Sequence, residues 1–122
     1  MHKKADLTAI LVEQVSNSTW CIGRVPVAIA AHLDAKITKG ANSPEQKARF
    51  IAQAHGLLRS ILGNELPTAT YVVVDEVDGD AWGYDGVTQN QRHRTIGSRI
   101  LAGLRQLWRA QFVPSGWERP LP

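Results

Sequence analysis

The strongest constraint on the fold is a helix signal between residues 43 and 64, which is flanked on both sides by strand patterns. Ser43 is a preferred N-cap residue, Pro44 suits the first helical position, and Gln46 completes a capping box. Apolar residues then recur every three or four positions, and Gly63-Asn64 supplies the left-handed conformation that ends a helix. The sequence therefore predicts a helix of about 19 residues with one buried face.

Before this helix, apolar residues occupy every odd position from Val25 to Ile37, and polar residues fill the even positions of the second half. Alternation with period two is typical of a strand with one buried face. We expect the strand to end near Thr38. Because the pattern is long for one strand, we expect a break near Pro26 or Ala30.

After the helix, residues 70–77 form a β-branched run that predicts a buried central strand. A strand, a long helix and a second strand with short connections predict a β-α-β unit with parallel strands. Residues 81–88 combine glycines with aromatic rings and predict a tight loop or a hairpin. Two strands and one helix cannot bury a core alone, which favours a homo-oligomer or packing by the terminal extensions.

Residues 31–88 resemble the short subunits of the 4-oxalocrotonate tautomerase family. The segments that carry the resemblance, in order and spacing, are Lys36–Lys39, Ser43–Lys47, Val72–Val77 and Asp80–Gly86. The resemblance implies an α+β fold with a tautomerase-like β-α-β unit followed by a small hairpin, assembled as a homo-oligomer of the trimer or hexamer type. It also implies proton transfer on small enol or keto acids, by an amino-terminal proline that acts as base. We expect no cofactor, and no metal either, because the histidines are scattered and the chain has a single cysteine.

The resemblance assigns candidate site residues to this chain. The position of the family's proline falls on Ala31, and Trp82 matches the aromatic residue that forms an apolar wall beside it, so these two are the catalytic candidates. Two positions at which the family has substrate-binding arginines fall on Asn42 and Tyr71. Together with Lys36, these are the substrate-binding candidates.

Ala31 is the weak point of this assignment, because a nitrogen inside a chain is an amide and cannot act as a base. Two alternatives would restore a terminal amine. Translation from Val25 would make Pro26 the amino terminus, and cleavage after Ala30 would expose Ala31 as a primary amine. The sequence thus predicts a tautomerase or isomerase acting on small enol or keto acids, with a non-catalytic oligomeric protein of the same fold as the alternative.

Size and charge suggest how the rest of the chain is organised. We expect one domain over residues 1–122, in which residues 1–30 extend the 31–88 core and residues 92–122 form a basic tail. The tail holds six arginines against Glu118, and its apolar spacing predicts an amphipathic helix. We expect this helix to cover the sheet or a neighbouring subunit. Its arginines and tryptophans would also suit an anionic surface, but we expect neither nucleic acid nor a membrane as partner.

Cys21, the single cysteine of the chain, cannot form an internal disulfide. We expect it to be a small buried apolar side chain. A chain with a single cysteine and no disulfide suits a reducing cytoplasm, and we expect this protein to be cytoplasmic.

Overall fold

The computed structural model describes residues 1–16 and 19–94. The chain divides into two compact units, Met1–Val77 and Asp78–Pro122, and each unit is described by itself. Among the described residues, no helix has both the length and the apolar character that crossing a bilayer requires.

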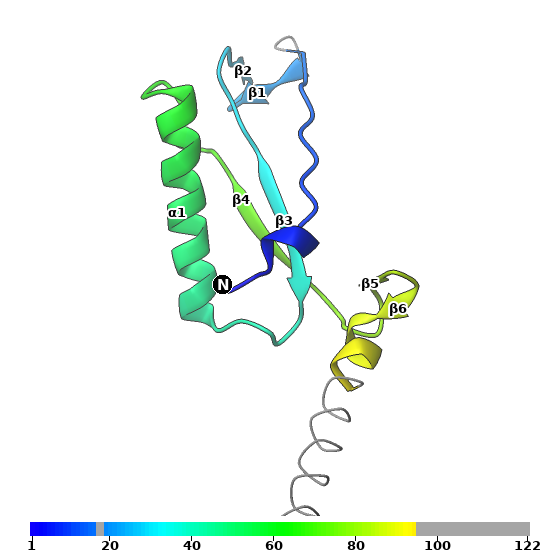
Figure 1. Cartoon of the computed structure of the whole chain (residues 1–122). Helices are drawn as coiled ribbons and strands as arrows, with labels where there is room; N and C mark the ends of the chain where they lie inside the picture. Colours follow the sequence, from blue (N-terminus) through cyan, green and yellow to red (C-terminus); the bar gives the residue numbers. More distant parts are fainter. Residues whose placement is uncertain (17–18, 95–122) are drawn as a thin grey trace, which may run out of the picture. The chain divides into compact units, whose positions relative to one another are not determined.

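The first unit is built on a β-α-β arrangement in which α1 (Pro44–Leu62) lies beside two strands (Figure 1). β3 (Leu33–Thr38) and β4 (Val72–Val77) pair in parallel, from Leu33 opposite Val72 to Thr38 opposite Val77. The predicted mixed α+β fold with parallel strands and one long helix is therefore confirmed.

Local side-chain chemistry explains where α1 begins and ends. The Ser43 hydroxyl accepts a hydrogen bond from the Gln46 backbone N–H at 3.2 Å, and the Gln46 side-chain oxygen accepts from the Ser43 N–H at 2.9 Å. Gly63 ends the helix with φ of 94°, and its N–H donates to the Arg59 carbonyl at 2.8 Å. The predicted capping box and glycine stop are both present.

The two faces of the β3–β4 pair differ in character. Residues directly opposite each other share a face, so Ala35, Ile37 and Glu76 point to the side of α1, and the even residues of β3 point away from it. Ile37 is only 5% exposed, and Leu66, after α1, is 8% exposed. These are the two buried apolar side chains of the described residues, so the core of the unit is small.

The alternating pattern before the helix divides into separate elements, as the expected break implied. β1 (Cys21–Ile22) and β2 (Val25–Pro26) form a short antiparallel hairpin, and β3 starts only at Leu33. The prediction for Cys21 was wrong, because this hairpin leaves its side chain exposed. The expectation of a buried central strand was also wrong, since β4 is half-buried along its length and, in the described part, pairs with β3 alone.

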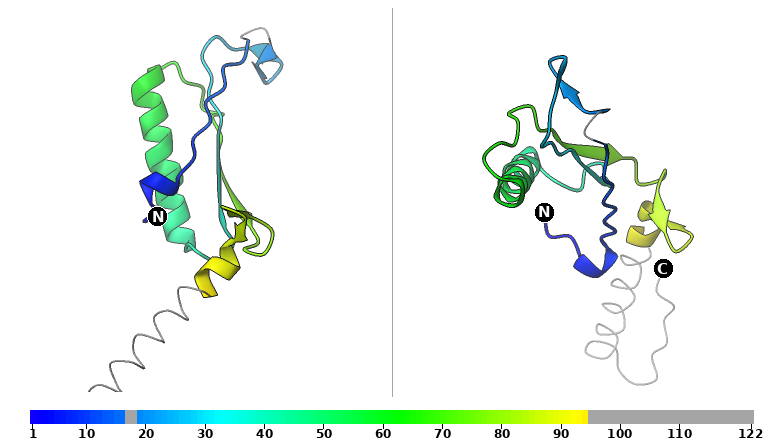
Figure 2. Two further views of the ribbon diagram at one scale, coloured as in Figure 1. Left: turned by 45° about the vertical axis from the view of Figure 1, so that its right-hand side comes forward. Right: turned by 90° about the horizontal axis from the view of Figure 1, so that it is seen from above.

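The amino-terminal segment exposes apolar side chains. η1 (Ala5–Leu7) is a single 3₁₀ turn, and residues 8–16 follow as chain without helix or strand (Figure 2). Ile10, Leu11 and Val12 are each 82% exposed. Short apolar runs fit both strand and helix periods, and here neither forms.

The second unit contains the predicted hairpin, formed by β5 (Gly83–Tyr84) and β6 (Val87–Thr88). Asp85 and Gly86 join the strands with φ of 53° and 75°, the pair of positive values that a two-residue type I′ turn requires. Residues 89–94 are helical, but the predicted amphipathic tail helix falls mostly on residues 95–122 and lies outside the described residues.

Candidate functional site

The face of the sheet that points away from α1 gathers polar side chains from both strands. Lys36 on β3 lies directly opposite Asp75 on β4, and the Lys36 ammonium donates to the Asp75 carboxylate at 2.7 Å. Both side chains are largely open to solvent, with 60% and 47% exposed. The hydrogen bond from Lys36 to Asp75 raises the pKa of the Lys36 ammonium above its usual range, and the carboxylate charge adds to this effect.

His32 and Asp34 form a second polar pair on the same face. The His32 Nε2 atom lies 3.0 Å from the Asp34 Oδ2 atom. Side chains two positions apart project from the same side of a strand, and this spacing brings the two groups into contact. Neither residue was among the candidate site residues predicted from the sequence. The i, i+2 spacing of a histidine and a carboxylate at the start of a strand is the signal that could have found the pair.

Tyr71, a substrate-binding candidate, comes immediately before β4. The Leu33 N–H donates to the Tyr71 carbonyl at 3.1 Å, and Leu33 opposite Val72 is the first pair of the register. His32 and Tyr71 are therefore the residues that directly precede this first pair on the two chain segments. The Tyr71 side chain is 66% exposed. Lys36 lies four register positions further along, roughly 13 Å at the usual rise of a strand. The structure therefore brings Tyr71 near His32 rather than near Lys36.

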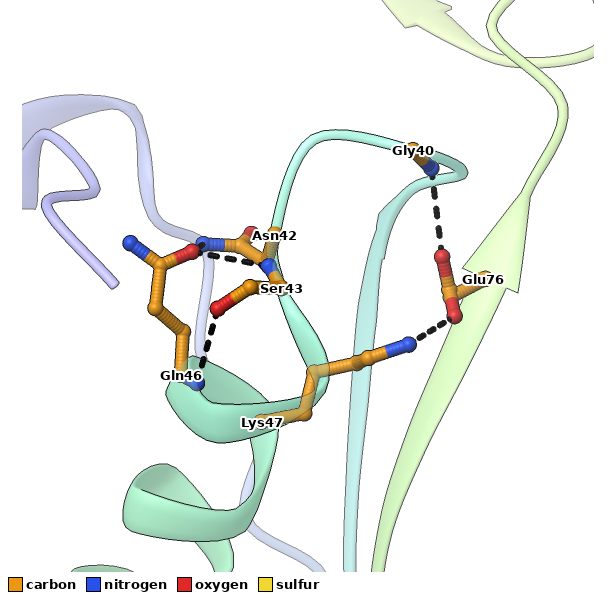
Figure 3. A network of polar contacts seen from close by, with 6 residues as sticks. All are labelled: Gly40, Asn42, Ser43, Gln46, Lys47 and Glu76. Atoms are coloured by element: carbon orange, nitrogen blue, oxygen red, sulfur yellow. Dashed lines mark hydrogen bonds and ion pairs between the residues drawn. The ribbon is translucent and has the colours of Figure 1, made fainter.

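Asn42, the third substrate-binding candidate, belongs to the cap of α1 (Figure 3). Its side-chain amide donates to the Gln46 Oε1 atom at 3.0 Å, and the same oxygen accepts from the Ser43 N–H. The Asn42 side-chain oxygen, Oδ1, is buried and has no hydrogen-bond partner among the described residues. Asn42 therefore supports the start of the helix, with one acceptor atom left unsatisfied.

A further polar network joins α1 to the end of β4 (Figure 3). One Glu76 carboxylate oxygen accepts from the Lys47 ammonium, and the other accepts from the Gly40 N–H at 3.2 Å. The bond from Lys47 lowers the pKa of the Glu76 carboxyl, with the Gly40 N–H as the next cause. These residues link three segments of the fold, and their partners could not be seen from sequence spacing.

The two catalytic candidates belong to different units. Ala31 comes just before β3 and is half-buried, and its nitrogen is a peptide amide. Trp82 belongs to the second unit, where it is half-buried and its carbonyl accepts from the Gln89 N–H at 3.0 Å. The assignment of catalytic roles to these two residues stays a prediction. Within residues 1–16 and 19–94, no group of three or more histidine, cysteine or acidic side chains comes together as a metal site.

Comparison with known proteins agrees with this architecture. The family model described as "Tautomerase enzyme" matches residues 32–91, which span the β-α-β arrangement and the hairpin. The chain is similar to "Probable tautomerase K2" of Dickeya dadantii (strain 3937), at 39% identity over 59 residues that cover 48% of this chain and 87% of that protein. No solved structure matches the chain significantly. The shared sequence and the β-α-β architecture together show that this chain belongs to the tautomerase family.

Proposed function

We propose that this chain is an isomerase that transfers a proton on a small enol or keto acid. Membership of the tautomerase family carries the proposal. The polar sheet face supports it, because that face offers groups suited to proton transfer and anion binding. Lys36 is the cation of the face, and His32 with Asp34 is a proton-accepting pair.

We also propose that the working form is a homo-oligomer of the trimer or hexamer type. In its described part, the first unit has a small core and two separate two-stranded sheets, and such sheets seldom hold a structure alone. Leu57 and Ile61 of α1 are 61% and 68% exposed. Apolar side chains on a helix are usually buried against another surface, and a second copy would bury them.

A non-catalytic oligomeric protein is the second candidate, and one observation favours it. The positions that the family resemblance assigns to a basic amine and two arginines hold Ala31, Asn42 and Tyr71. Asn42 is engaged in the helix cap, and the ammonium of Lys36 is already paired with Asp75. A chain that kept the fold and lost these groups would retain a structural or binding role.

Ketonisation of phenylenolpyruvate separates the two candidates. The proposed enzyme converts the enol to the keto acid faster than buffer alone, and the rate rises in proportion to protein concentration. Lys36→Ala raises KM, because the cation that would bind the substrate carboxylate is lost. A wild-type rate equal to that of buffer would favour the non-catalytic candidate.

A further inference from the structure

We propose that His32 is the proton-accepting residue of this chain, that Asp34 positions it, and that Tyr71 donates a hydrogen bond to the substrate oxygen. The inference rests on the proposed function. Proton transfer requires a base, and the peptide nitrogen of Ala31 cannot act as one. Four observations carry it, namely the His32–Asp34 contact, the placement of Tyr71, the exposure of these groups and the charges around them.

The contact between His32 and Asp34 determines which imidazole nitrogen can act. An ionised carboxylate accepts hydrogen bonds and does not donate them, so the Nε2 atom, 3.0 Å from Asp34 Oδ2, carries the proton. In a neutral imidazole the other nitrogen then holds a lone pair. The Nδ1 atom of His32 is therefore the proton acceptor, and the imidazole is held from its far side, as in enzymes that orient a histidine through a carboxylate.

The register places a hydrogen-bond donor beside this base. His32 and Tyr71 directly precede the first ladder pair, Leu33 opposite Val72, and the Leu33 N–H donates to the Tyr71 carbonyl at 3.1 Å. Neighbouring strands lie about 4.8 Å apart, so the two residues stand at the same end of the strand pair. A phenol hydroxyl can donate to the oxygen of a carbonyl or an enolate. A base and a donor on adjacent strands can therefore address the two ends of a small keto–enol system.

All three side chains are open to a ligand. The exposed fractions of the His32 and Asp34 side chains are 45% and 57%, and Tyr71 is 66% exposed. The other charged groups on this face of β3 and β4 are Lys36 and Asp75, which neutralise each other at 2.7 Å. The Asp34 carboxylate is thus the charge next to the imidazole that no cation on this face balances.

The proton balance of the step is simple. In ketonisation, Nδ1 of neutral His32 takes the enol hydroxyl proton, the O–H bond breaks, and the oxygen becomes an enolate that accepts from the Tyr71 hydroxyl. The imidazolium then gives its proton to the alkene carbon that does not bear the oxygen. The electron pair of the C=C bond forms the new C–H bond there, and an electron pair of the enolate oxygen forms the C=O bond. The keto product and the neutral imidazole are left, and nothing is oxidised or reduced.

Activity of the full-length chain tests the two reacting groups, with phenylenolpyruvate as the probe. His32→Ala should lower kcat by at least about 10²-fold, because a general base typically contributes about 10²–10⁴-fold. Tyr71→Phe removes only the hydroxyl and should lower kcat by roughly 10²-fold as well, if its donor stabilises the enolate. His93→Ala removes an exposed histidine of the second unit and should leave kcat unchanged. Circular dichroism and thermal melting of each variant show that it remains folded.

The role of Asp34 needs a readout other than rate. In wild type, ¹⁵N chemical shifts of the imidazole should show the Nε2–H tautomer for His32. Asp34→Asn should convert this to a mixture of tautomers, with a lower kcat and an unchanged KM. Asp34→Glu should recover part of the rate. The wild-type tautomer persisting in Asp34→Asn would overturn the positioning role.

The outcomes separate this inference from the function on which it rests. An active wild type whose His32→Ala variant is equally active overturns the histidine as base and leaves the proposed function standing. A wild-type protein that ketonises phenylenolpyruvate no faster than buffer overturns both the proposed function and the role of His32. Intact mass of the assayed protein completes the test. Activity in chains beginning at Met1 supports His32, and activity confined to chains beginning at Pro26 or Ala31 assigns the base to a terminal amine and overturns the inference.

Discussion

At the scale of single residues, ionisable groups in this chain do two kinds of work. Glu76 is bound by Lys47 and Gly40 on the α1 side of the sheet and ties the fold together. His32 and Asp34 are exposed on the opposite side and are available to a ligand. The two carboxylates therefore have different roles, because Glu76 projects from the α1 side of the β3–β4 pair and Asp34 projects from the opposite side.

Glu76 gives a prediction for pH dependence. Its pKa is lower in the folded protein than the ordinary glutamate value of about 4.3, so the folded state binds its proton less readily than the unfolded state. Its contribution to stability is complete above that value and is lost as the pH falls through the lowered folded pKa. Glu76→Gln should therefore unfold at lower urea than wild type at neutral pH, and the difference should shrink below about pH 4.

The matched control for this prediction is Glu65→Gln, which changes an exposed glutamate in the loop after α1. Its urea midpoint should follow that of wild type at every pH. If the gap between Glu76→Gln and wild type stayed constant from neutral to acid pH, the stabilising role of the Glu76 charge would be wrong.

At the scale of elements, two glycines that look similar in the sequence meet different surroundings. Gly56 lies in the middle of α1, and a Cβ added there would meet nothing within 4 Å. Gly83 opens β5, and a Cβ there would collide with the backbone of Val87 across the hairpin. The first glycine is replaceable, and the second is required for the strands to approach.

These surroundings predict opposite effects on thermal stability. Gly56→Ala should stabilise the protein by about 1 kcal/mol, because alanine costs less entropy in a helix interior. Gly83→Ala should destabilise its unit by about 1–3 kcal/mol, the usual cost of forcing an extra carbon into a tight contact. Scanning calorimetry of the two variants beside wild type measures both effects, and shifts of the same sign would contradict the explanation.

The cap of α1 gives a further prediction at this scale. Ser43→Ala removes the hydroxyl that accepts from Gln46 and should cost about 1 kcal/mol, measured by urea unfolding. Ser43→Asp keeps an acceptor at the cap and should restore the wild-type midpoint. A loss of the same size in both variants would show that the cap bond does not stabilise the helix.

At the scale of the whole molecule, the first unit leaves several large apolar side chains exposed. Leu57 and Ile61 share one side of α1, and Ile10 and Leu11 add to the exposed apolar surface of the unit. Hydrophobic burial is the main favourable term in folding, so this surface supports the proposal that several copies assemble.

Charge placed on this surface should prevent assembly. Leu57→Glu combined with Ile61→Glu should reduce the molar mass measured by light scattering to that of one chain, because a carboxylate is costly to bury without a partner. Ala52→Glu adds the same kind of charge to an exposed position about 140° around the helix from Leu57 and should leave the molar mass unchanged. An unchanged mass in the double variant would place the interface elsewhere.

Local sequence signals determined the elements of the β-α-β arrangement. The Ser43 cap, the glycine stop and the β-branched run after the helix act over a few residues, so their consequences could be predicted without the fold. The family resemblance added the order of the elements. Burial was predicted less well, as the exposed Cys21 and the half-buried β4 show, because burial depends on which surfaces meet.

The candidate site depended on the tertiary structure. The register between β3 and β4 sets Lys36 opposite Asp75, 39 positions away in the sequence, and its first pair, Leu33 opposite Val72, brings the preceding residues His32 and Tyr71 to the same end of the strand pair. A shift of one residue in that register would send these side chains to the other face. The sequence alone therefore determined which elements form, through contacts within a few residues, whereas strand pairing decided which functional groups meet, because it joins residues that no local pattern connects.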